Sequence, residues 1–152
     1  MADQQIDFTL RPIGVIRSPL KERSQAPRQG SEGAPDVWVE IDPVAAEGLE
    51  GLVVGQEVIV LTWLHQARRE TLKVYPRTGP KDPAQANTGP GRGTRLMGVF
   101  ATRSPDRPNP VGLHRVTVRA IEKGRILLGP MEAIDGTPVL DIKPVLTCSP
   151  GS

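Results

Sequence analysis

The segment VGLHRVTVRAIEKGRILLGP, residues 111–130, decides the fold because it reads as a β-hairpin. Two strand-like apolar runs flank Lys123-Gly124, and a glycine-containing pair between such runs is typical of a tight turn. Apolar runs of the same kind recur on both sides of this hairpin. We therefore expect further strands over residues 8–18, 37–41, 56–65, 69–77, 96–103 and 138–146, with another turn at 134–137.

The chain between residues 37 and 65 holds a short helix and the strongest strand signal. Asp42-Pro43 suits the cap and the first position of a helix, and Gly48 and Gly51 limit this helix to a turn or two. QEVIVLTWLH, residues 56–65, is a continuous apolar run. Such a run predicts a strand that is buried on both faces.

Composition favours a mainly β fold. The 152 residues include 16 Gly and 16 Pro, and only 3% are aromatic, so Val, Ile and Leu must fill the core. Many of the glycines and prolines lie between apolar runs, which indicates short strands and tight turns. We predict one domain over residues 1–152, a single antiparallel β-barrel, closed or partly closed, with minor helix.

Several function classes lack their sequence signals. GPGRGT, residues 89–94, is not a phosphate-binding loop, and no dinucleotide fingerprint follows a strand. With one cysteine, Cys148, and two distant histidines, we expect no metal site. We also expect a cytoplasmic protein with no membrane association, because no secretion signal and no membrane-spanning stretch is seen. The net charge of +2 is compatible with a polyanionic partner.

TRSPDRPNP, residues 102–110, combines stiffness with charge, and we call it the proline loop. Each proline fixes its own φ and restrains the preceding residue, so the segment is stiff and extended. Arg103 and Arg107 offer fork-shaped donors for a carboxylate or phosphate, and Asn109 offers an acceptor and two donors. The residues alone leave two interpretations open, a rigid ligand-binding wall and a rigid connector between strands.

Other polar residues have plain structural interpretations. QAPRQG, residues 25–30, lies in a long loop over residues 19–35, which suits a solvated excursion as well as a functional loop. His65 and His114 each end or begin an apolar strand, where a histidine is usually a structural residue. Asp141 and Lys143 lie on one face of a strand and can pair with each other.

FATRSPDRPNPVGLHRV together with DGTPVLDIKP resembles the YaeB/TrmO/VirR family of S-adenosylmethionine-dependent methyltransferases over nearly the whole chain. The resemblance implies a β-barrel fold unlike the Rossmann methyltransferases, and a homodimer with cofactor sites near the interface. It implies N6-methylation of threonylcarbamoyl-adenosine at position 37, in the anticodon loop of tRNA. By the same resemblance, the S-adenosylmethionine contacts fall on Pro27, Arg28, Gln29, His65, Gln66, Arg103, Leu113, Gly129, Pro130, Met131 and Glu132.

The chain departs from the family pattern near its end. The usual DIKPY reads DIKPV, with Val145 in place of tyrosine, and we expect no additional C-terminal domain of the kind that longer members have. Two alternatives to a tRNA methyltransferase therefore stay open. One is a methyltransferase with a small-molecule or other non-tRNA acceptor, and the other is a non-enzymatic S-adenosylmethionine-binding protein.

Roles for individual residues follow from the chemistry of methyl transfer. Arg28 or Arg103 is expected to meet the cofactor carboxylate. Asn109, with the carbonyls of Asn-Pro-Val, is expected to accept hydrogens from the adenine amine, which makes Asn109 the candidate catalytic residue. With few aromatic residues, contacts to RNA would depend on arginine and lysine. The candidates are Arg68, Arg69, Arg77, Lys81, Arg92 and Arg95.

Overall fold

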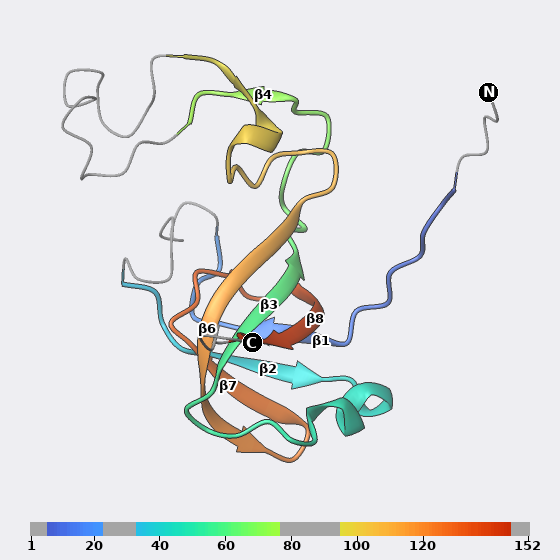
Figure 1. The fold of residues 1–152 in the computed structure, drawn as a ribbon, viewed down its shortest axis with the longest axis vertical. Helices are drawn as coiled ribbons and strands as arrows, with labels where there is room; N and C mark the ends of the chain where they lie inside the picture. Colours follow the sequence, from blue (N-terminus) through green and yellow to red (C-terminus); the bar gives the residue numbers. More distant parts are fainter. Residues whose placement is uncertain (1–5, 23–32, 77–94, 147–152) are drawn as a thin grey trace, which may run out of the picture. The chain divides into compact units, whose positions relative to one another are not determined.

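The computed structural model describes residues 6–22, 33–76 and 95–146 (Figure 1). It divides the chain into two compact units, each treated by itself below. The barrel unit consists of Met1–Trp63 with Gly112–Ser152, and the loop unit consists of Leu64–Val111. None of the helices in the described ranges is long and apolar enough to cross a membrane.

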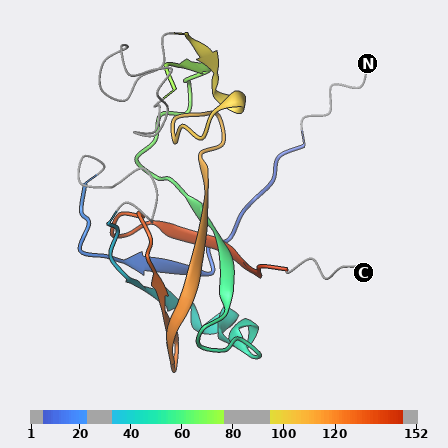
Figure 2. The same cartoon turned by 60° about the vertical axis from the view of Figure 1, so that its left-hand side comes forward.

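The barrel unit is a closed antiparallel β-barrel, as the sequence predicts (Figures 1 and 2). Its strands follow the order β1-β2-β7-β6-β3-β8, and β8 pairs back with β1. Closure leaves no open sheet edge in this barrel. The strands are β1 (Gly14–Arg17), β2 (Val37–Ile41), β3 (Glu57–Trp63), β6 (Val111–Glu122), β7 (Arg125–Gly129) and β8 (Pro138–Pro144).

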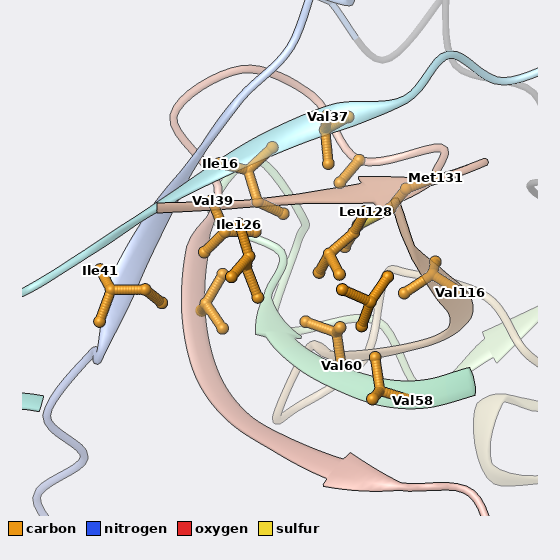
Figure 3. Close-up of a cluster of buried hydrophobic side chains, with 13 residues drawn as sticks. Ile16, Val37, Val39, Ile41, Val58, Val60, Val116, Ile126, Leu128 and Met131 are labelled. Carbon is orange, nitrogen blue, oxygen red and sulfur yellow. The ribbon is translucent and has the colours of Figure 1, made fainter. Parts of the chain in front are cut away.

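Branched aliphatic side chains fill the barrel interior (Figure 3). Alternate residues of each strand point inward, so β2 buries Val37, Val39 and Ile41. β3 alternates in the same way, with Val58, Val60 and Thr62 buried and the residues that follow each of them half-buried. The expectation of a strand buried on both faces is therefore wrong for β3, because its outer face lies on the outside of a closed barrel.

The predicted turns and the short helix are confirmed. η3 (Pro43–Leu49) is a 3₁₀ helix, and Asp42 Oδ1 accepts a hydrogen bond from the backbone N–H of Val44 at its start. β6 and β7 form the predicted hairpin, and Gly124 has φ +79° at its turn. A positive φ of this kind is readily adopted only by glycine.

The described residues of the loop unit, 64–76 and 95–111, contain much less strand than the sequence predicts for them. β4 (Lys73–Val74) pairs antiparallel with β5 (Met97–Gly98), and η5 (Val99–Ala101) follows directly. The expectations of strands over 69–77 and 96–103 are too long. The chain turns into η5 after β5, where the N–H of Thr102 bonds back to Val99 O, so the extended backbone ends at Gly98.

Candidate functional site

In the loop unit, the proline loop folds around the side chain of Arg107. Its Nε donates to Ser104 O at 2.8 Å, and its Nη2 donates to Val99 O at 2.7 Å and to Thr102 O at 2.6 Å. Ser104 Oγ in turn accepts from the N–H of Asp106. Arg107 is therefore committed to the backbone of its own loop, and it is not the ligand-binding fork that the sequence alone allowed.

A second arginine holds the end of the proline loop. Arg69 Nε donates to Pro108 O at 2.7 Å, and its Nη2 donates to Asn109 Oδ1 at 3.1 Å. The backbone N–H of Arg68 bonds to Asp106 Oδ1 at 2.8 Å. Residues 68–69 thus act as a clamp on the loop. Arg69 is also a predicted RNA contact, which stays a prediction, and its guanidinium supports Asn109.

The backbone carbonyls beside Asn109 are already engaged. Asn109 O accepts from the N–H of Val111 at 2.7 Å, and Pro110 O accepts from the N–H of Leu64 at 2.8 Å. Asn109 Oδ1 keeps a second lone pair besides the one that faces Arg69. Each of these two carbonyls also keeps a second lone pair, so they and the side chain of Asn109 all stay candidate acceptors in the loop.

Arg103 and His65 present free polar groups in the loop unit. Both side chains are exposed, and among the residues that the structure describes neither has a hydrogen-bonding or ionic partner. His65 and Gln66 lie in the turn after β3, where the N–H of Ala67 bonds to Leu64 O. The interpretation of His65 as a buried structural residue is wrong, because the strand ends before it.

In the barrel unit, His114 is buried and hydrogen-bonded at both ring nitrogens, as expected for a structural histidine. Nε2 lies 2.8 Å from Thr62 Oγ1, and Nδ1 lies 2.7 Å from Glu132 Oε1. The two partners come from β3 and from the connection between β7 and β8. Thr62 carries no recognisable signal in the sequence, because it appears as one polar residue inside an apolar run.

The predicted cofactor residues 129–132, which we call the GPME segment, include the partner of this histidine, Glu132. A Cβ added at Gly129 would overlap Asp36 Oδ1, so only glycine fits there. The side chain of Met131 is fully buried, and its N–H bonds to Pro35 O at 2.9 Å. Pro130 and Glu132 are partly exposed.

Leu113 lies on the outer face of β6, next to His114 in the sequence. Leu113 is 48% exposed, and Val111 on the same face of β6 is 40% exposed. An exposed apolar side chain of this size can pack on the flat face of a planar ring.

The long loop over residues 19–35 is held where it leaves the barrel. Asp135 Oδ1 accepts from the N–H of Ser18 at 3.0 Å, and its Oδ2 lies 3.0 Å from Lys21 Nζ. The backbone bond from Ser18 and the Lys21 ammonium lower the pKa of Asp135 below its usual value. At the other end of the loop, Pro35 O accepts the hydrogen bond from the N–H of Met131. The predicted cofactor residues Pro27, Arg28 and Gln29 lie outside the described residues.

Other predictions concern charged residues and metals. Asp141 and Lys143 pair at 3.1 Å, as expected. Arg68 and Arg95 are exposed, whereas Arg77, Lys81, Arg92 and Cys148 fall outside the described ranges. Within those ranges no group of three His, Cys, Asp or Glu side chains is arranged to hold a metal ion.

One pocket of about 500 Å³ lies in the barrel unit, lined by η3 and strand residues such as Ile13, Leu49, Leu52 and Ile142. None of the described residues predicted to bind the cofactor lines this pocket. Its lining is largely apolar, with the acidic residues Glu50 and Asp141 and no cationic side chain. It therefore does not suit the carboxylate of S-adenosylmethionine.

The chain is similar to proteins from archaea and bacteria. It is 41% identical over 145 residues to a probable S-adenosyl-L-methionine-binding protein of Methanothermobacter thermautotrophicus, covering 95% of this chain and 93% of that protein. A protein of Archaeoglobus fulgidus with the same description is 44% identical over 137 residues, which is 89% of this chain but 33% of that protein.

A crystal structure of TrmO from Pseudomonas aeruginosa has the same fold. It superposes with a TM-score of 0.71 at 33% identity, over 95% of this chain. The present chain covers only 57% of that TrmO chain. Residues 15–149 match the family described as the tRNA-methyltransferase O N-terminal domain. This match confirms the resemblance carried by the RSPDRPNPVG and DGTPVLDIKP motifs, and the chain therefore belongs to the tRNA-methyltransferase O N-terminal domain family.

Proposed function

We propose that this chain is an S-adenosylmethionine-dependent methyltransferase that acts on tRNA. The family match over residues 15–149 carries the proposal, because it includes every motif on which the cofactor residues were predicted. In its finer form, the proposal is N6-methylation of threonylcarbamoyl-adenosine at position 37. The protein would act in the cytoplasm as a homodimer and engage the anticodon loop.

The described side chains fit the chemistry of S-adenosylmethionine. Arg103 has a guanidinium with no described partner, which suits the cofactor carboxylate. Glu132 has a partly exposed carboxylate, which suits an ammonium or a ribose hydroxyl. Leu113 offers an apolar surface for the adenine ring. When bound, S-adenosylmethionine would supply a methyl group activated by the adjoining sulfonium.

The residues of the proline loop would orient the acceptor. Arg69 fixes the amide of Asn109 through a bond to Oδ1, so this oxygen is held in one place before any acceptor arrives. An oxygen held in this way can accept a hydrogen bond from the N6–H of the adenine and so direct the nitrogen lone pair at the methyl group. As the N–CH3 bond forms, the S–CH3 bond of the sulfonium would break, S-adenosylhomocysteine would leave, and the N6 proton would pass to solvent. Preorganisation of this kind lowers the entropic part of the activation free energy for methyl transfer.

The experiment uses the purified chain with radiolabelled S-adenosylmethionine and tRNA that carries threonylcarbamoyl-adenosine. We expect label in this tRNA and none in tRNA that lacks the threonylcarbamoyl group. Arg103→Ala should abolish labelling, whereas Arg125→Ala, a surface arginine on β7 paired with Glu122, should retain it. Equal labelling by Arg103→Ala and wild type would contradict the proposed cofactor role of Arg103.

A second candidate function is S-adenosylmethionine binding without tRNA methylation, including transfer to another acceptor. The descriptions of the relatives favour it. The Methanothermobacter protein, which is 93% covered by this chain, is described only as a probable binding protein, while the TrmO chain extends well beyond the matched part. Tight binding of S-adenosylmethionine with no label in any tRNA would select this candidate.

A further inference from the structure

A continuous chain of polar side chains crosses the apolar interior of the barrel. Thr62 is fully buried, His114 is 5% exposed, and Glu132 has a side chain that is 22% exposed. The chain runs from Thr62 Oγ1 through the imidazole to Glu132 Oε1, with contacts of 2.8 and 2.7 Å. It thus links β3, β6 and the GPME segment, which are 52 and 18 residues apart along the sequence.

The chemistry of the three groups fixes how they bond. A carboxylate only accepts, so Nδ1 of His114 donates to Glu132. Nε2 is then left facing the Thr62 hydroxyl, which can donate to it or accept from it. Both ring nitrogens therefore have a hydrogen-bonding partner. The imidazole therefore has one favourable orientation.

The GPME segment is held at two points. The backbone of the segment is held at Met131, through its bond to Pro35 O and its buried side chain. At Glu132 the only described side-chain partner is His114. Oε1 is drawn toward the interior by that bond, which leaves the rest of the carboxylate partly exposed at the barrel surface.

We propose that Thr62 and His114 are positioning residues that hold Glu132, and with it the GPME segment, in the shape that receives S-adenosylmethionine. The inference rests on the proposed function for the identity of the ligand. The hydrogen-bond chain itself concerns only the barrel unit. Thr62 acts through His114 and touches no ligand.

Thr62→Val is the sharpest test, because valine has nearly the shape of threonine and lacks only the hydroxyl. Thr62→Ser restores the hydroxyl and serves as the rescue variant. Val39→Ala is the matched control, since Val39 is a fully buried core residue on β2 outside the polar chain. This control lowers stability through a cavity and leaves the three polar side chains in place.

Two measurements are made on each variant at a temperature where all are folded. The first is amide hydrogen exchange at Met131, whose N–H bonds to Pro35 O, and it requires no ligand. The second is titration with S-adenosylmethionine by calorimetry. For Thr62→Val we expect faster exchange at Met131 and a dissociation constant raised on the order of tenfold. Thr62→Ser should resemble wild type in both measurements.

The outcomes separate the inference from the proposed function. Unchanged exchange at Met131 in Thr62→Val would overturn the inference, whatever the ligand result. Equal loss of affinity in Val39→Ala would also overturn it, because general destabilisation would then explain the effect. If wild type fails to bind S-adenosylmethionine while Thr62→Val still loosens Met131, the positioning chain stands and the proposed function fails.

Discussion

The two arginines of the proline loop should respond to alanine substitution in opposite ways. Arg107 donates three hydrogen bonds to backbone carbonyls of its own loop, whereas Arg103 is exposed with no partner among the described residues. Arg107→Ala should therefore disorder the loop and lower stability. Arg103→Ala should leave stability unchanged and remove only ligand affinity.

The magnitude follows from the bonds of Arg107. Hydrogen bonds from a charged donor contribute about 1.5–3 kcal/mol each, but the three share one partly buried side chain and are not additive. We expect Arg107→Ala to cost about 2–3 kcal/mol in total. For a chain of this length, each kcal/mol lowers the melting temperature by about 2–4 °C, so the shift is roughly 4–12 °C.

The assay combines thermal melting with hydrogen exchange at Thr102, whose N–H bonds to Val99 O inside the loop. If the two units melt separately, one melting temperature does not describe the stability of the loop unit. Hydrogen exchange at Thr102 does, because Thr102 lies in that unit. Arg107→Ala should accelerate exchange at Thr102, and Arg103→Ala should not. If both variants melt together with wild type, or if both lose the same stability, the assignment of Arg107 as scaffold and Arg103 as ligand contact is wrong.

Three further predictions concern other parts of the chain. Gly129→Ala should destabilise the barrel by about 1–3 kcal/mol in urea unfolding, because the new Cβ overlaps Asp36, and Asp36→Ala in the same chain should restore part of the loss. The contribution of Asp135, measured as the difference in unfolding free energy from Asp135→Asn, should be fully present above its unfolded pKa near 3.8. Because the folded pKa lies lower, this difference should shrink as the pH falls through the folded pKa, and a difference that grows on acidification would contradict the bonds to Ser18 and Lys21. Asn109→Ala should lower kcat for methyl transfer with little change in the affinity for S-adenosylmethionine, and transfer at the wild-type rate would exclude Asn109 as the acceptor.

Local patterns predicted the barrel well where each strand could be recognised by itself. VWVEI over residues 37–41 alternates, and β2 has the same bounds. The hairpin at Lys123-Gly124 is marked by its turn residues. The segments 69–77 and 96–103 contain similar apolar residues, but they belong to the small loop unit. Among their described residues, two of each segment form strand pairs, Lys73 with Gly98 and Val74 with Met97. Pairing partners, and not local propensity, set strand length there.

The site was harder to predict because its bonds join residues that are distant in sequence. Arg103 and Arg107 look alike in RSPDRP, and only the three carbonyls around Arg107 distinguish them. Thr62 and His114 lie 52 residues apart, and each alone reads as a polar residue in an apolar strand. Composition cannot show that the two side chains share a hydrogen bond inside a barrel.

The proline loop is largely a scaffold that carries a few outward groups. Arg107, Asp106 and the hydroxyl of Ser104 bond within the loop or to its clamp at residues 68–69. Arg103 is left facing outward. Substitution of a scaffold residue such as Arg107, or of the outward-facing Arg103, would therefore reduce methyl transfer in either case. Activity alone cannot assign a catalytic role in this motif, and each variant needs a stability measurement beside its rate.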